Sequence, residues 1–127
     1  MPLVRISLLQ GKPAHYGKEV GEVVYQAMRS AITIPAHDHF QVITEHDLNS
    51  LIYDPTYLDI ERTDDFLVIQ ITLNEGRTLE AKKALYQEIA GRLHTTLGIR
   101  TEDVLINLIE VKKENWSFGN GIAQYAQ

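Results

Sequence analysis

Pro2 directly follows the initiator methionine and opens a stretch, residues 3–9, that is rich in strand-forming residues. If Met1 is removed, as is usual when a small residue follows it, Pro2 carries a free secondary amine at the end of a buried strand. An amine in such a place can take up or release a proton in a reaction near neutral pH. The alternative is that Pro2 only stiffens the start of an edge strand, a position that proline tolerates.

Arg77, in the turn Glu75-Gly76-Arg77-Thr78, is the residue best suited to hold a carboxylate, because a guanidinium binds one through two parallel hydrogen bonds. A solvated residue in the first turn of a helix is the alternative for Arg77. One positive charge about 6 Å from Pro2 would disfavour the protonated amine by about 3 kcal/mol at an effective dielectric of about 20, and burial acts in the same direction. Lys12, which occupies the position equivalent to Arg77 in the first half of the chain, could act as a weaker second cation.

The protonation state of Pro2 decides which chemistry is available. A neutral Pro2 abstracts a proton α to a carbonyl group and returns it elsewhere, which is a keto–enol tautomerisation. A cationic Pro2 instead polarises a carbonyl or protonates a carbanion, which suits decarboxylation or hydration. Both reactions therefore stay open at this point.

The elements that position these residues follow from an internal repeat. Residues 2–45 align without a gap on residues 67–110, an offset that pairs identical residues such as Ile6 with Ile71, Gly11 with Gly76 and Asp38 with Asp103. Each copy reads as strand, turn, helix and strand. The expected strands are 3–9, 40–44, 66–73 and 104–111, and the expected helices run from 13 to 31 and from the cap at 78 to the glycine at 98.

A strand–helix–strand unit of this size forms a right-handed crossover with parallel strands. We therefore predict a single α+β domain over residues 1–127, in which two tandem βαβ units form a four-stranded sheet with both helices on one face. The other face would carry a mixture that is too apolar for water and too polar for a core, which predicts an oligomer interface. Its members would be Leu3, Arg5, Ser7, Phe66, Val68, Gln70 and Thr72.

Two segments lie outside the repeat. Residues 47–65 read as irregular, with a short strand near 51–52. The tail, residues 112–127, carries Trp116-Ser117-Phe118 beside Gly119-Asn120-Gly121. This pattern predicts a small C-terminal hairpin that covers part of a subunit.

Taken together, the leading Met-Pro strand, the doubled βαβ unit, the Arg77 turn and the aromatic-glycine tail resemble the tautomerase superfamily. Each half resembles one 4-oxalocrotonate tautomerase-type subunit, and the segment Pro35-Ala36-His37-Asp38 with the Trp116 tail is most similar to the malonate semialdehyde decarboxylase branch. The resemblance implies the tautomerase/MIF-like fold, a homotrimer, an amino-terminal proline as catalytic acid or base, and an arginine that binds the substrate carboxylate.

Carried over residue by residue, the resemblance implies catalytic Pro2, Asp38 and Arg77, with Trp116 and Phe118 as an apolar wall around the substrate. Asp38 has an equally strong structural alternative, because its repeat partner Asp103 occupies the same place in the second copy. Glu75 stands where the decarboxylase branch has a second arginine. That departure counts against decarboxylation of malonate semialdehyde.

The amino-acid composition limits the classes of partner and chemistry that this chain can have. A net charge of −5 argues against nucleic-acid and anionic-membrane partners, and the lack of cysteine excludes disulfides and thiolate chemistry. No apolar run has the ~20 residues of a membrane span, and we expect no signal peptide and a cytoplasmic location. The pair His37 and His39 matches no metal-site spacing, so we expect no metal and no cofactor.

The sequence thus predicts a cofactor-independent tautomerase that acts on a small 2-keto or enol carboxylate. A decarboxylase or hydratase with a cationic Pro2 is the first alternative. A non-catalytic binding module on the same fold is the second.

Overall fold

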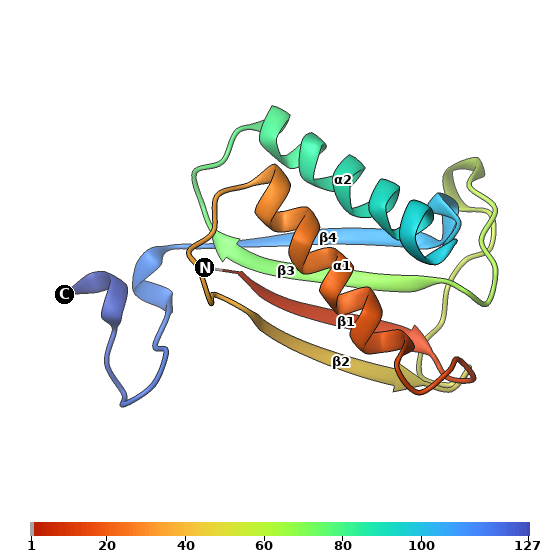
Figure 1. The fold of residues 1–127 in the computed structure, drawn as a ribbon, viewed down its shortest axis with the longest axis horizontal. Helices are drawn as coiled ribbons and strands as arrows, with labels where there is room; N and C mark the ends of the chain where they lie inside the picture. Colours follow the sequence, from red (N-terminus) through yellow and green to blue (C-terminus); the bar gives the residue numbers. More distant parts are fainter. Residues whose placement is uncertain (1) are drawn as a thin grey trace.

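A computed structural model describes residues 2–127, so the fate of Met1 lies outside the described residues. The two halves of the chain fold alike. The elements are β1 (Leu3–Leu9), α1 (Tyr16–Ala31), β2 (Phe40–His46), β3 (Leu67–Asn74), α2 (Leu79–Leu97) and β4 (Val104–Val111). Figure 1 shows both helices on one face of a single sheet.

The sheet has the order β2-β1-β3-β4, with parallel pairs β1–β2 and β3–β4 joined by an antiparallel pair at the centre. Leu3 is opposite Phe40 on one side and Thr72 on the other. The starts of β1 and β2 and the ends of β3 and β4 therefore meet at one end of the sheet, which is also where the tail leaves β4 (Figure 1). The predicted α+β fold of two βαβ units is confirmed.

The core lies between the sheet and the two helices. Alternate residues of the central strands face the helices and are almost fully buried, as a period of two requires. Residues at helical spacing meet them from above. The core includes Val4, Ile6, Leu8, Val20, Val24, Met28, Ile69, Ile71, Leu85, Ile89 and Leu93.

The helix boundaries follow local chemistry. Thr78 caps α2 by accepting a hydrogen bond from the Ala81 amide at 3.1 Å, and Gly98 ends it with a left-handed φ of 68°. Helix α1 begins at Tyr16 rather than at Pro13, because the Pro13 carbonyl accepts from the Tyr16 amide in a separate turn. No helix within residues 2–127 is long and apolar enough to cross a membrane.

The helix-free face carries large exposed apolar side chains, and Phe40, Val42, Leu105 and Ile109 are each 41–51% exposed. Phe66 packs with Leu9 and Val68 on this same face, but it is only 3% exposed, because residues of the linker 47–65 cover it. The linker forms no strand, so the strand expected near 51–52 is wrong.

The C-terminal hairpin predicted over 112–127 is also wrong, because the described residues of this segment form no strands. Within the described tail there are two short 3-10 turns, Lys113–Asn115 and Gln124–Ala126. The physical reason is that the side chain of Gln124, not a partner strand, supplies hydrogen bonds to the backbone at Phe118 and Gly119.

Candidate active site

Pro2 is buried at the start of β1. It precedes Leu3, whose neighbours across the sheet are Phe40, the first residue of β2, and Thr72, near the end of β3. The sheet thereby fixes what surrounds Pro2. The residues that directly follow β3 and those that directly precede β2 therefore lie at the same end of the molecule as Pro2.

Asp38 lies two residues before the start of β2. Its amide donates to the Pro35 carbonyl at 3.3 Å, and His37 takes a left-handed φ of 65°, so the chain turns sharply here. The side chain is 8% exposed. Burial raises the pKa of the Asp38 carboxyl above the ordinary value of an aspartate. A carboxyl in this state can hold a proton at a higher pH than an ordinary aspartate.

Asp38 and Phe118 line the same pocket, which has a volume of about 210 Å³. The tail supplies one wall through Phe118 and Tyr125, whose rings meet edge to face at 4.8 Å. Trp116 stacks on Phe118 with ring centroids 5.5 Å apart. The aromatic residues of the tail therefore form one cluster, of which Phe118 and Tyr125 line the pocket of Asp38.

Arg77 follows the end of β3 and is held by the last residue of that strand. Its Nη1 atom donates to the Asn74 carbonyl at 3.1 Å, while the side-chain oxygen of Asn74 accepts from Trp116 Nε1 at 2.7 Å. Arg77 lines a second hollow of about 500 Å³, together with Glu75 and Lys113. Asn74 thus links the arginine turn to the aromatic tail.

Sequence reasoning missed Asn74. A signal existed, because the repeat pairs Asn74 with the apolar Leu9. A polar residue that replaces an apolar one in only one copy marks a place where the two halves have diverged.

The five residues taken from the sequence gather at one end of the sheet, but they do not line one cavity. Asp38 and Phe118 share the smaller pocket, while Arg77 faces the larger hollow. Lys12, the possible second cation, lies at the far end of β1. It forms an ion pair with Asp65 and lies over the ring of Tyr16, 5.5 Å from the centroid.

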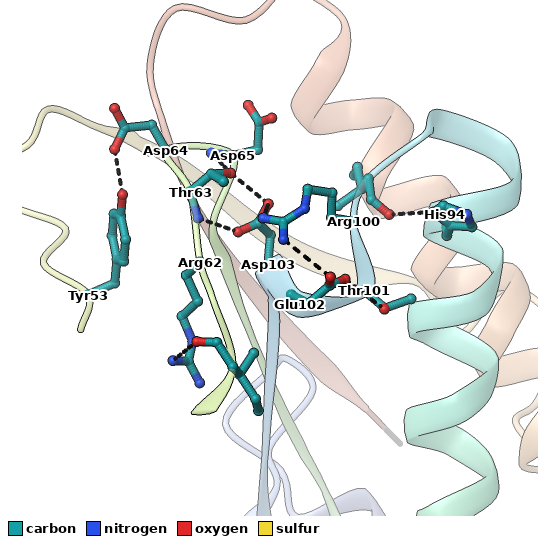
Figure 2. Close-up of polar contacts among 12 residues, drawn as sticks. Tyr53, Arg62, Thr63, Asp64, Asp65, His94, Arg100, Thr101, Glu102 and Asp103 are labelled. Carbon is teal, nitrogen blue, oxygen red and sulfur yellow. Dashed lines mark hydrogen bonds and ion pairs between the residues drawn. The ribbon is translucent and has the colours of Figure 1, made fainter. Parts of the chain in front are cut away.

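Asp103, the repeat partner of Asp38, has a structural role (Figure 2). It is fully buried, and its carboxylate accepts from both the amide and the hydroxyl of Thr63 at 2.7 Å. Arg100 lies 3.5 Å from the same carboxylate. Asp103 therefore ties the linker to the start of β4. The structural role that the sequence analysis considered for Asp38 is thus the role of Asp103.

The histidines near Asp38 are engaged in packing and turn formation. His39 stacks on Tyr25 at 4.0 Å, and His37 forms part of the turn. Among residues 2–127, no three metal-ligating side chains gather at one point.

Comparison with known proteins places this arrangement in a family. Residues 38–119 match the model of the tautomerase enzyme family. The chain is 45% identical over 124 residues to the probable tautomerase YusQ of Bacillus subtilis (strain 168), with 98% of each chain covered.

Comparison with solved structures leads to the same family. An FG41 malonate semialdehyde decarboxylase inhibited by 3-bromopropiolate superposes with a TM-score of 0.90 at 32% identity, covering 97% of this chain and 93% of that one. A fused 4-OT symmetric trimer superposes with a TM-score of 0.77 at 20% identity, covering 98% of both chains, and this likeness concerns the fold alone. The resemblance seen in the sequence is confirmed: the chain belongs to the tautomerase family of enzymes.

Proposed function

We propose that this enzyme is a cofactor-independent tautomerase that uses Pro2 as a general base on a small 2-keto or enol carboxylate. The observation that carries the proposal is the position of a buried Pro2 at the sheet end where Asp38 and the Asn74–Arg77 pair also lie. Removal of Met1 is a chemical requirement, since an acylated proline nitrogen is an amide and has no basicity.

In the proposed reaction, Arg77 binds the substrate carboxylate and thereby orients the carbon that bears the acidic proton. The neutral Pro2 nitrogen takes that proton, which leaves an enolate, and returns it to another carbon or to the enolate oxygen. Asp38, with its raised pKa, supplies a group that can hold or give a proton near the carbonyl oxygen. The aromatic cluster of Trp116 and Phe118 limits access of water.

A decarboxylase or hydratase with a cationic Pro2 is the second candidate. It is favoured by the likeness to a malonate semialdehyde decarboxylase over nearly the whole chain. Glu75 opposes it, because its carboxylate beside Arg77 lowers the positive charge available to hold a second anionic group. For this reason the tautomerase remains the preferred assignment.

A homotrimer belongs to the proposal. The exposed apolar side chains of Phe40, Val42, Leu105 and Ile109 support burial of the open face against other copies of the chain. The cytoplasmic location stays a prediction from composition.

The test is turnover of a panel of enol and 2-keto carboxylates by the wild-type enzyme and by Pro2→Ala, with the mass of the native amino terminus measured first. Loss of the proline base should lower kcat/KM by about 10²–10⁴-fold. Pro55→Ala, in the exposed linker, is the matched control and should keep full activity. Equal turnover by Pro2→Ala and the wild type would support the binding module instead.

A pH profile of kcat/KM separates the two catalytic candidates. An enzyme that needs a neutral Pro2 gains activity as the pH rises through the pKa of that amine. An enzyme that needs a cationic Pro2 loses activity over the same range.

A further inference from the structure

The side chain of Gln124 closes the C-terminal tail on itself. Its Oε1 atom accepts from the Phe118 amide at 2.9 Å, and its Nε2 atom donates to the Gly119 carbonyl at 2.9 Å. One carboxamide therefore satisfies a donor and an acceptor on adjacent residues of the opposite arm. This pairing is what a strand partner would provide, although the tail contains no strand.

The backbone between the two arms is built for this closure. Gly119, Asn120 and Gly121 have positive φ values of 143°, 59° and 68°. Glycine reaches this region without strain, and asparagine tolerates it better than most residues. The chain reverses within these residues, which brings Gln124 back to Phe118.

Closure of the tail fixes two rings relative to each other. Phe118 carries the amide that Gln124 holds, and Tyr125 is the residue that follows Gln124. The two rings meet edge to face at 4.8 Å, and both line the pocket of Asp38. Both are still 37–40% exposed, so packing alone does not restrain them strongly.

We propose that Gln124 is a positioning residue for the substrate pocket, which keeps Phe118 and Tyr125 in place over Asp38 by holding the tail closed. This inference rests on the proposed function, because it assigns the pocket to the substrate. Only an amide supplies both hydrogen bonds: glutamate retains the acceptor and loses the donor, and leucine has neither. The residue therefore sets how well an apolar part of the substrate is held, while Pro2 transfers the proton and Arg77 binds the carboxylate.

The test compares Gln124→Leu and Gln124→Glu with Gln127→Ala, a change in the same tail at a side chain that makes no hydrogen bond in the described structure. In Gln124→Leu the closed tail becomes a minor population, so KM should rise about three- to tenfold while kcat stays within about twofold. Gln124→Glu should fall between Gln124→Leu and the wild type. Gln127→Ala should match the wild type.

A second readout needs no substrate. Trp116 is the only tryptophan of the sequence and stacks on Phe118, so its emission reports the position of the tail. Gln124→Leu should shift the emission to longer wavelength and increase quenching by acrylamide, with an unchanged unfolding midpoint showing that the fold persists.

Wild-type emission or wild-type KM in Gln124→Leu would overturn the inference, and so would a loss confined to kcat. These outcomes are distinct from failure of the proposed function. That failure appears as an activity that survives Pro2→Ala, or as a wild-type enzyme that turns over no enol carboxylate, whereas the emission of Trp116 tests the closure of the tail in either case.

Discussion

Trp116 donates its indole N–H to the side chain of Asn74 at 2.7 Å, which joins the aromatic tail to the end of β3 across 42 residues of sequence. The carbonyl of the same asparagine accepts from Arg77. One residue thus sets the position of the proposed carboxylate-binding arginine and of the aromatic wall. Asn74 therefore contacts both the arginine turn and the aromatic tail.

Asn74→Ala should lower kcat/KM by up to about tenfold, because a single hydrogen bond contributes about 0.5–1.5 kcal/mol and its loss leaves Trp116 unanchored. Asn74→Asp keeps an acceptor oxygen and should preserve the emission of Trp116. Steady-state kinetics and tryptophan fluorescence measure the two effects. Asn49→Ala, in the exposed linker, is the control. Wild-type kinetics and emission in Asn74→Ala would remove Asn74 from the site.

Arg77→Lys tests the requirement for a guanidinium. A lysine keeps the positive charge but cannot form two parallel hydrogen bonds with a carboxylate, and hydrogen bonds to charged groups contribute about 1.5–3 kcal/mol. We expect KM to rise about tenfold or more for carboxylate substrates. Arg92→Lys, which alters a partly exposed ion pair on α2, should leave KM unchanged. A substrate whose KM is equally low with lysine at position 77 is not held by this residue.

Asp103→Asn should destabilise the fold by about 1–3 kcal/mol. The carboxylate accepts two hydrogen bonds from Thr63 in a fully buried place, and an asparagine N–H₂ group would bring a donor against those donors. The urea midpoint measures the effect, while kcat per folded molecule should not change. An unchanged midpoint would mean that the linker is held in place by other contacts.

Asp38→Asn should have the opposite effect on stability from Asp103→Asn. Burial raises the pKa of Asp38, so the folded state keeps the proton at pH values where the unfolded chain has already lost it. The free energy of unfolding then falls as the pH rises above the ordinary pKa of an aspartate. Asparagine does not ionise at this position, so the variant should gain stability relative to the wild type as the pH rises from 3 to 7.

Urea unfolding at several pH values measures this trend, and turnover at neutral pH tests whether the carboxyl also takes part in the reaction. A stability difference that does not vary with pH would contradict the burial of an ionisable Asp38. Full activity in Asp38→Asn would assign the residue a structural role after all.

The repeat made the fold predictable, whereas the roles within it had to come from tertiary contacts. Alternation and helical spacing in two copies define the strands and helices, and their order defines the sheet. Asp38 and Asp103 occupy equivalent positions in the sequence repeat, so the sequence does not distinguish their roles. The difference comes from a tertiary contact, because the linker residue Thr63 donates hydrogen bonds to Asp103 and not to Asp38. The closed tail was missed for a similar reason, since a side chain of Gln124 replaces the backbone pairing of a hairpin.

Val42 lies on the open face of the sheet, opposite Arg5 and 43% exposed. If this face is buried between copies of the chain, Val42→Asp places a carboxylate in an apolar interface, and burying an isolated charge costs several kcal/mol. We therefore expect the variant to elute as a monomer in size-exclusion chromatography with light scattering, at a concentration where the wild type elutes as the proposed trimer. Ala84→Asp introduces the same charge on the exposed side of α2 and should remain a trimer. A trimeric Val42→Asp would assign the assembly to another surface and leave the exposed apolar residues of the sheet to a different partner.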